Sequence, residues 1–323
     1  MRGQAENGVA HKKRAAEWKR NLNGALCVFG ARFSGRKARK ACYRTRMTTT
    51  ENVSTDGLQL SGWAVILGAS SGFGEAIALE LARHGMNIAG VHLDRRSTMS
   101  NVARIVSQIE ALGRQALFFN QNAADEQKRR DICDELAKKA SGLAQPQVRV
   151  LVHSLAFGTL RPFVPPGETA TDVIGKSHLE MTCDVMGHSL LYWTQDLLGR
   201  GLLARGSRIF ALTSAGSHRV VPEYGAVAAA KAALESHCRQ LALELGPRGI
   251  AVNALCAGVT DTPALRKIPG HEKMIAVAQE RNPGRRLTLP QDVAGAVVVL
   301  SHPLAGWISG NVIHVDGGED IVG

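Results

Sequence analysis

The chain has 323 residues and a formal net charge of +11. Residues 1–46 hold 13 Lys and Arg against two Asp and Glu, whereas residues 47–323 hold 26 of each. Because phosphate binding needs a basic face, this electrically balanced body argues against a nucleic-acid-binding module.

The spacing of the cysteines and the length of the apolar runs exclude further classes of protein. The six cysteines are spread along the chain without a CxxC pair. This pattern indicates neither a disulfide framework nor a metal site, and it fits a protein of a reducing compartment. No apolar run approaches the 18 residues of a membrane-spanning helix. We therefore expect a cytoplasmic protein without a metal and without a membrane span.

Residues 1–46 form a basic leader, and Met47 then opens a polar run before the first apolar strand. Three interpretations are open for the leader. It is a disordered or mis-assigned upstream extension with Met47 as the working start, an organelle-targeting peptide, or a basic arm for nucleic acid or membrane. We exclude it from the fold and expect residues 47–323 to form one NAD(P)-binding domain that works without it.

Short apolar strands alternate with helical stretches along this body. The predicted strands are residues 63–67, 87–93, 116–119, 148–152, 207–213, 250–255 and 311–315. The predicted helices are residues 75–83, 99–112, 126–140, 177–199, 225–245, 272–281 and 290–300. Strands buried on both faces and separated by helices predict an α/β fold, a doubly wound, parallel, seven-stranded sheet of the Rossmann type.

A glycine-rich segment, GASSGFG at residues 68–74, joins the first strand to the first helix. Glycine permits a tight turn and lets the backbone approach a pyrophosphate, and the following helix N-terminus offers unpaired N–H groups. We therefore expect a dinucleotide on this loop. Its contacts are assigned to Gly68, Ser70, Ser71, Gly72, Phe73 and Gly74.

The end of the second strand bears on which dinucleotide binds. NAD enzymes usually carry an acidic residue at the end of the second strand, which holds the adenosine ribose. Asp94 could take this role, but the usual position, counted from Gly68, lies nearer His92. Arg95 and Arg96 suit a 2′-phosphate, which arginine grips in a fork. We favour NADPH over NADH, with these two arginines as ligands.

Further motifs accompany the loop: Ser214, Lys231, VNAL (252–255), AGVTDT (257–262) and VDGG (315–318). With GASSGFG, they make residues 60–320 resemble the short-chain dehydrogenase/reductase family. The chain departs from that family at one place, because Val227 stands four residues before Lys231, where most members carry the catalytic tyrosine.

The nearest tyrosine is Tyr224, which gives the spacing Y-x6-K with Lys231. This spacing, HSLAF at 153–157, and the stretch 257–286 are similar to the enoyl-acyl-carrier-protein reductases, and to their third type in particular. The resemblance implies hydride transfer to the β-carbon of a 2-enoyl thioester in fatty-acid synthesis, and Arg95 and Arg96 favour NADPH as the hydride donor. Ser214 instead matches the ordinary family, and the alternative is a 3-oxoacyl-thioester reductase or another short-chain alcohol dehydrogenase.

The resemblance also implies roles for the catalytic residues. Tyr224 donates a hydrogen bond to the thioester oxygen and stabilises the enolate. Lys231 binds the nicotinamide ribose, and its charge is expected to lower the pKa of Tyr224. Ser214 is expected to orient the substrate or the tyrosine. The enolate then takes a proton from Tyr224 or from water, and His153 is expected to be structural.

The remaining contacts follow from the same resemblance. Asn122 and Ala123, at the end of the third strand, contact adenine, and Leu155 and Ala156 pass beneath the adenosine ribose. Val259, Thr260 and Thr262 belong to a segment, residues 259–262, that is expected to close over the nicotinamide carboxamide and the phosphates. Substrate contacts fall to Phe157, Gly158 and Tyr224.

The sequence also leads us to expect particular binding partners. Segment 263–286 carries six basic residues against two glutamates. It is either a solvated charged face or a dock for an acidic acyl carrier protein. The thioester is therefore carried by acyl carrier protein or by CoA. The resemblance implies a homotetramer with helices 177–199 and 225–245 at one interface.

Overall fold

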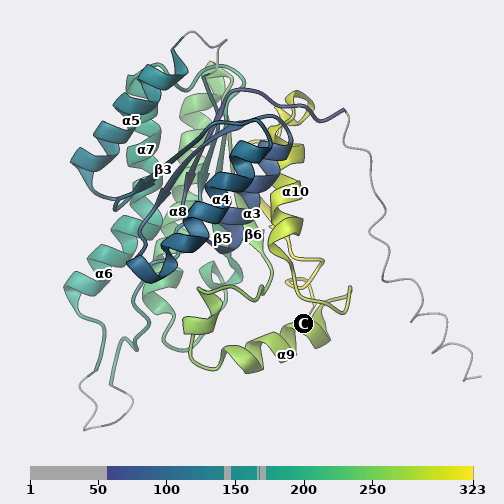
Figure 1. Ribbon diagram of the computed structural model, residues 1–323. Helices are drawn as coiled ribbons and strands as arrows, with labels where there is room; N and C mark the ends of the chain where they lie inside the picture. Colours follow the sequence, from purple (N-terminus) through teal and green to yellow (C-terminus); the bar gives the residue numbers. More distant parts are fainter. Residues whose placement is uncertain (1–56, 142–146, 166, 168–171, 323) are drawn as a thin grey trace, which may run out of the picture. The chain divides into compact units, whose positions relative to one another are not determined.

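The computed structural model describes residues 57–322 except for 142–146, 166 and 168–171 (Figure 1). The basic leader lies outside the described residues, so the predictions made for it stay predictions. Within the described part of the chain, no helix is long and apolar enough to cross a membrane. The cytoplasmic location stays a prediction.

Seven parallel strands form one sheet in the order β3-β2-β1-β4-β5-β6-β7. The strands are β1 (Trp63–Leu67), β2 (Asn87–His92), β3 (Ala116–Asn120), β4 (Val148–His153), β5 (Arg208–Ser214), β6 (Ala251–Ala257) and β7 (Val312–Val315). The predicted fold class is confirmed. Strands β2 and β3 lie on one side of β1, and β4 to β7 lie on the other, so the strand order reverses between β1 and β4. Ligands bind at such a switch point, at the carboxyl ends of the strands.

Helices cover both faces of the sheet (Figure 1). The helices are α3 (Gly72–Arg83), α4 (Met99–Ala111), α5 (Glu126–Ala140), α6 (Lys176–Cys183), α7 (Ser189–Gly199), α8 (Gly225–Leu245), α9 (His271–Arg281) and α10 (Pro290–Ser301). Residues of α3, α4 and α10 share one buried cluster, and residues of α5, α7 and α8 share the other.

The strands alternate between these two clusters because successive side chains point to opposite faces. In β1, Ala64 and Ile66 lie in the cluster with α3, whereas Val65 and Leu67 lie in the cluster with α5. All are fully buried, which explains why the strands read as continuous apolar runs.

The helix predicted at 177–199 contains an interruption that the sequence pattern did not reveal. A π turn at Asp184–His188 separates α6 from α7. At its centre Gly187 packs against α8, where a Cβ atom would lie 3.0 Å from the carbonyl oxygen of Ala230. The Ser189 hydroxyl donates to the Val185 carbonyl at 2.7 Å. The prediction of one regular helix is therefore wrong at this turn.

The third strand ends at Asn120, one residue beyond its predicted end, and does not reach Asn122 and Ala123. These two residues lie in the turn before α5 rather than at the end of the strand. The Asn122 side chain accepts a hydrogen bond from the Ala124 N–H at 3.0 Å, which favours a turn over extended backbone.

Candidate active site

The glycine-rich loop follows β1 and leads directly into α3, as expected. Gly68 and Gly72 have φ of +89° and +57°, in the left-handed region that glycine tolerates. A Cβ atom on Gly68 would overlap the carbonyl oxygen of Ser154, and one on Gly74 would overlap that of Gly68. The loop is therefore a bare backbone surface at a helix N-terminus, which fits a pyrophosphate.

Side chains from α4 hold this loop in place. Asn101 donates to the Ser70 carbonyl at 2.7 Å and to the Glu75 carboxylate at 3.0 Å. Arg104 forms an ion pair with Glu75 in the first turn of α3. The ion pair offsets the acidic charge of Glu75. Ser71 is the N-cap residue of α3, and Phe73 is partly buried against the core.

The end of β2 presents a mixed electrostatic environment. Buried His92 shares a hydrogen bond with Asp94 at 2.9 Å, and burial lowers the pKa of His92 against the opposing effect of that carboxylate. Burial alone would raise the pKa of Asp94, but hydrogen bonds from Ser70, Thr98 and His92 outweigh it, so the carboxylate is ionised.

Arg95 and Arg96 are exposed beside this carboxylate. Within the described part of the chain neither guanidinium takes part in an ion pair. Both groups are therefore available to an anionic ligand.

The residues expected near adenosine are brought to the same edge of the sheet. Ala123 is buried, and its carbonyl accepts a hydrogen bond from the Trp193 indole at 2.8 Å. Leu155 is partly buried, Ala156 is exposed, and both follow β4. Since β4 adjoins β1 at the switch point, these residues border the glycine-rich loop.

Tyr224 stands at the N-terminus of α8, where it is the N-cap residue. Its hydroxyl lies 3.4 Å from the Ser214 hydroxyl at the end of β5. Gly216 makes room for the ring, because a Cβ atom there would come within 2.9 Å of Tyr224 Cδ1. Burial raises the pKa of Tyr224, and the bond with Ser214 opposes this rise. The phenol is therefore protonated at neutral pH.

Lys231 lies two turns further along α8 and is buried. Its ammonium donates to the Leu212 carbonyl at 2.7 Å and to the Leu155 carbonyl at 3.3 Å. Burial lowers its pKa to about 8, opposed by the charge of Glu235. Burial and the bond with Ser214 are the two causes of the shift in the pKa of Tyr224, so the lowering that we expected from the Lys231 charge is not seen.

Val227 occupies the position of the ordinary family's tyrosine and is buried among apolar groups. It packs on Gly158, where a Cβ atom would lie 2.7 Å from Val227, 2.8 Å from Thr182 and 2.9 Å from Met186. This space is filled by neighbours, so a phenol ring has no room there.

His153, at the end of β4, is fully buried. Its Nε2 lies 2.9 Å from the Ser189 hydroxyl. That hydroxyl gives its proton to the Val185 carbonyl, so Nε2 carries the hydrogen and donates it to Ser189. Burial, and next the charge of Lys231, lower the pKa of His153 to about 3. A neutral, buried imidazole holding the π turn agrees with the structural role that we expected.

The loop after β6 contains residues expected near the nicotinamide. Thr260 and Thr262 are buried, and their hydroxyls bond to the Gly258 carbonyl at 3.0 Å and the Leu265 N–H at 3.2 Å. The Val259 N–H points to the Glu319 carboxylate, 3.2 Å away at the nearer oxygen. The sequence analysis missed Glu319, because no local spacing connects residues 60 positions apart.

The substrate side of the site is apolar. Phe157 and Phe163 are about half exposed, at 54% and 57%, in the segment after β4. The Phe163 ring packs against Gly225, next to Tyr224, within 2.8 Å of where a Cβ atom would stand. An apolar surface beside the tyrosine suits an acyl chain.

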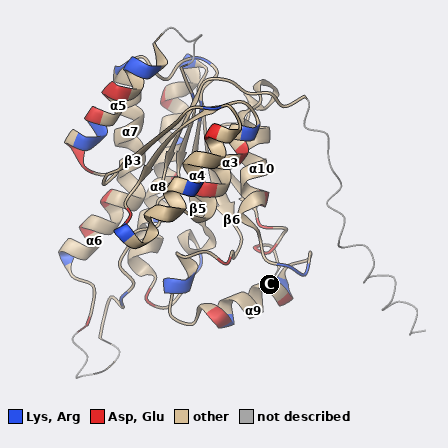
Figure 2. Ribbon diagram, in the orientation of Figure 1, with Lys and Arg blue, Asp and Glu red and all other residues tan. Residues whose placement is uncertain are grey.

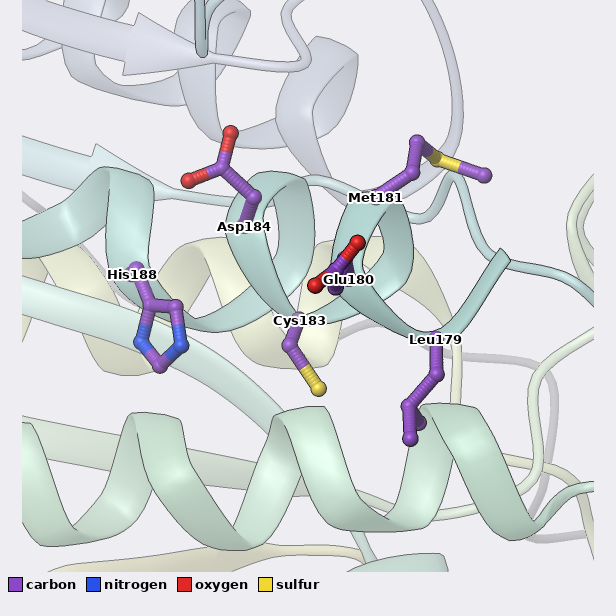
Figure 3. Close-up of a pocket in the computed structure, with 6 residues that line it drawn as sticks. All are labelled: Leu179, Glu180, Met181, Cys183, Asp184 and His188. Atoms are coloured by element: carbon purple, nitrogen blue, oxygen red, sulfur yellow. The ribbon is translucent and has the colours of Figure 1, made fainter. Parts of the chain in front are cut away.

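A separate hollow of about 500 Å³ lies along α6 and the π turn (Figure 3). Figure 3 shows Leu179, Cys183 and His188 on the side that faces α8, with Asp184 and Met181 pointing away. His188 Nδ1 lies 2.9 Å from His237 Nε2 on α8. None of the expected site residues lines this hollow, so it is distinct from the candidate active site. Among the described residues, no three His, Cys, Asp or Glu side chains are placed to hold a metal ion.

Comparison with known protein families agrees with this geometry. Residues 68–319 match the family model described as enoyl-(acyl carrier protein) reductase. The chain belongs to this family. The matched residues include the glycine-rich loop, Ser214, Tyr224 and Lys231.

Individual relatives are more distant. The 1-cyclohexenylcarbonyl-CoA reductase of Streptomyces collinus is 29% identical over 262 residues, which cover 80% of this chain and 87% of the relative. The enoyl-acyl-carrier-protein reductase (NADH) FabI of Escherichia coli is 38% identical over 120 residues, or 37% of this chain and 46% of FabI. The crystal structure of enoyl-acyl-carrier-protein reductase (NADH) from Aquifex aeolicus superposes with a TM-score of 0.70 at 25% identity, covering 83% of this chain and 99% of that one. The chain is therefore an oxidoreductase of this reductase family.

Proposed function

We propose that this protein is an NADPH-dependent enoyl-acyl-carrier-protein reductase that reduces the double bond of a 2-enoyl thioester in fatty-acid synthesis. One observation carries the proposal. The phenol nearest Lys231 is Tyr224 at the start of α8, whereas buried Val227 fills the position used for carbonyl reduction.

The chemistry explains why this displacement matters. When hydride reaches the β-carbon of an enoyl thioester, negative charge develops on the thioester oxygen, which is further from the nicotinamide than the carbonyl of an oxo substrate. Three residues are nearly one helical turn, so both positions lie on roughly the same side of α8, about 5 Å apart along its axis. Bound NADPH supplies the hydride. Tyr224 donates a hydrogen bond to the developing oxyanion, and its raised pKa keeps the proton available.

Reduction of a 3-oxoacyl thioester is the second candidate. Ser214 favours it, because a hydroxyl ten residues before Tyr224 and 3.4 Å from its phenol is typical of the ordinary family. The two candidates differ in substrate, so an assay of NADPH oxidation with crotonyl and acetoacetyl thioesters separates them.

Tyr224→Phe tests the catalytic role directly. The variant keeps the ring against Gly216 but removes the donor, and loss of one oxyanion donor lowers kcat by about 100- to 1,000-fold. The matched control is Tyr192→Phe on α7, which removes a phenol that donates to Asp184 at 3.0 Å. Full activity of the Tyr224 variant would contradict the proposal, as would an equal loss in the control.

NADPH is proposed as the cofactor because Arg95 and Arg96 are exposed at the end of β2. The double variant Arg95→Gln with Arg96→Gln is expected to lower kcat/KM for NADPH by about 100-fold or more, since each of the two charge-assisted bonds contributes roughly 1.5–3 kcal/mol, and to leave NADH unaffected. A wild-type preference for NADH would overturn this assignment, and Asp94 would then be the ribose ligand.

Acyl carrier protein is proposed as the carrier, with CoA as the alternative. Around α9, basic and acidic residues are interspersed along the chain (Figure 2). Arg266 is paired with Asp261 at 2.7 Å and Arg286 with Asp292 at 2.6 Å, so part of the basic cluster is already neutralised. Changing Arg266 and Lys267 to Glu is expected to raise KM for carrier-bound substrate far more than for CoA thioester. Equal effects would remove the docking proposal.

A homotetramer is proposed as the assembly, with α6, α7 and α8 at one interface. The hollow along α6 and the π turn offers a concave surface for a neighbouring subunit. Light scattering on the purified protein is expected to give a mass four times that of the chain, and a monomer would contradict it.

A further inference from the structure

The C-terminal segment after β7 contains the motif VDGG, which the site above did not use. Asp316 organises it, because its carboxylate accepts hydrogen bonds from the N–H groups of Gly318 and Asp320, both at 2.9 Å. Gly317 and Gly318 have φ of +64° and +84°, which only glycine adopts readily. The resulting turn presents Glu319 and Asp320 toward the carboxyl ends of β5 and β6.

Glu319 reaches the loop after β6. Its two carboxylate oxygens lie 3.2 Å and 3.4 Å from the Val259 N–H. The side chain also packs on Gly258, where a Cβ atom would lie 3.0 Å from it. This loop is the one expected to close over the nicotinamide.

Asp320 reaches the loop after β5. Its carboxylate lies 3.0 Å from His218 Nε2 and 2.8 Å from Arg219 Nε. Arg219 also donates to the Asp320 carbonyl. His218 and Arg219 belong to the loop that begins at Ser214 and ends at Tyr224.

The segment is anchored from the other side by α9. Asn282, just past this helix, donates to the Asp316 carbonyl at 2.7 Å, and Arg281 donates to the Val322 carbonyl. The C-terminal end of the chain lies beside α9 in Figure 1. One short segment therefore joins three separate parts of the chain that border the site.

We propose that Asp320 and Glu319 are positioning residues, which hold the Tyr224 loop and the Val259 loop in register with each other. The proposal rests on the catalytic role proposed above for Tyr224. Neither carboxylate contacts that phenol, and each acts through backbone or side chains of a loop. Among the residues that the structure describes, the one hydrogen-bond partner of the Tyr224 hydroxyl is Ser214, at a long 3.4 Å. Its placement therefore depends on how firmly the loop is held.

The test is made on the full-length protein with Asp320→Ala and Asp320→Asn. The matched control is Asp134→Ala, which breaks another Asp–Arg pair between distant segments, to Arg200 at 2.6 Å. Because small misplacements of a reacting group are costly, Asp320→Ala is expected to lower kcat by about 10- to 100-fold. Asp320→Asn keeps an acceptor for Arg219 and is expected to recover much of the loss, whereas the control keeps wild-type kcat.

Two further readouts separate positioning from general destabilisation. Hydrogen exchange of peptides covering 215–224 is expected to accelerate in Asp320→Ala, while peptides covering β6 stay protected. Glu319→Ala is expected to raise KM for NADPH more than it lowers kcat, and Glu319→Gln, which keeps an acceptor for Val259, is expected to restore it.

Unchanged kcat and exchange in Asp320→Ala would overturn the proposal, as would an equal loss in Asp134→Ala. If the wild-type protein does not reduce an enoyl thioester, the proposed function fails. The exchange data and the binding of NADPH to the variants still decide whether the segment holds the two loops.

Discussion

Lys231 gives a stability prediction whose size follows from its surroundings. The ammonium is buried and bonded to two carbonyl oxygens, and burial lowers its pKa from 10.5 to about 8. In the unfolded chain the same group titrates near 10.5. One pKa unit corresponds to about 1.4 kcal/mol, so the protonated lysine destabilises the folded state by about 3 kcal/mol relative to the unprotonated one.

The sign of the pH dependence follows from proton counting. Between pH 8 and pH 10.5 the unfolded chain binds the Lys231 proton more tightly than the folded chain, so stability from this group rises with pH. Between pH 7 and pH 10 the folded protein is expected to gain about 2–3 kcal/mol from Lys231. The variant Lys231→Met keeps an apolar stem, loses the charge and lacks this gain.

The measurement is urea denaturation of wild type and Lys231→Met at several pH values, without cofactor. The difference between their free energies of unfolding is expected to change by about 2–3 kcal/mol in favour of the wild type as pH rises from 7 to 10. Lys273→Met is the control, because this lysine is exposed on α9. Parallel curves for wild type and Lys231→Met would refute the reasoning about burial.

Three further predictions follow from the packing of the site. Val227→Tyr is expected to destabilise the protein by about 1–3 kcal/mol in denaturation, because the ring meets Gly158 and its neighbours, and to confer no reduction of acetoacetyl thioester; gain of that activity would contradict the packing argument. Gly74→Ala is expected to abolish NADPH binding in a fluorescence titration, because the new Cβ atom overlaps the Gly68 carbonyl; a wild-type Kd would rule this out. Burial raises the pKa of Glu319, so its ionised form destabilises the fold. Glu319→Gln is therefore expected to be at least as stable as wild type at pH 7, with the advantage shrinking as falling pH protonates the glutamate; lower stability at pH 7 would contradict it.

Much of the fold was predictable because short stretches of sequence mark its strands and helices. Strands buried on both faces appear as continuous apolar runs, and all seven were found with ends within two residues of those in the structure. The π turn at Asp184–His188 was not predictable, since one extra residue barely changes the apolar periodicity of a helix. Its cause, the close approach of Gly187 to α8, is a tertiary contact.

The site likewise contains features that the sequence predicted and features that it did not. The spacing of Ser214, Tyr224 and Lys231 placed these residues on adjoining elements, as the structure has them. The rise in the pKa of Tyr224 was not predicted, because burial causes it and burial is a property of the packed core. Glu319 and Asp320 were missed because their partners lie 60 to 102 positions away in the chain.

The central claim is that hydride goes to the β-carbon of an enoyl thioester. The direct test gives the protein a mixture of crotonyl and acetoacetyl thioesters with NADPH deuterated at the transferable position, and locates the deuterium by NMR. We expect deuterium at the β-carbon of a saturated butyryl product, with the oxo thioester unreacted. Deuterium on the carbinol carbon of a 3-hydroxybutyryl product, with the crotonyl thioester unreacted, would contradict it.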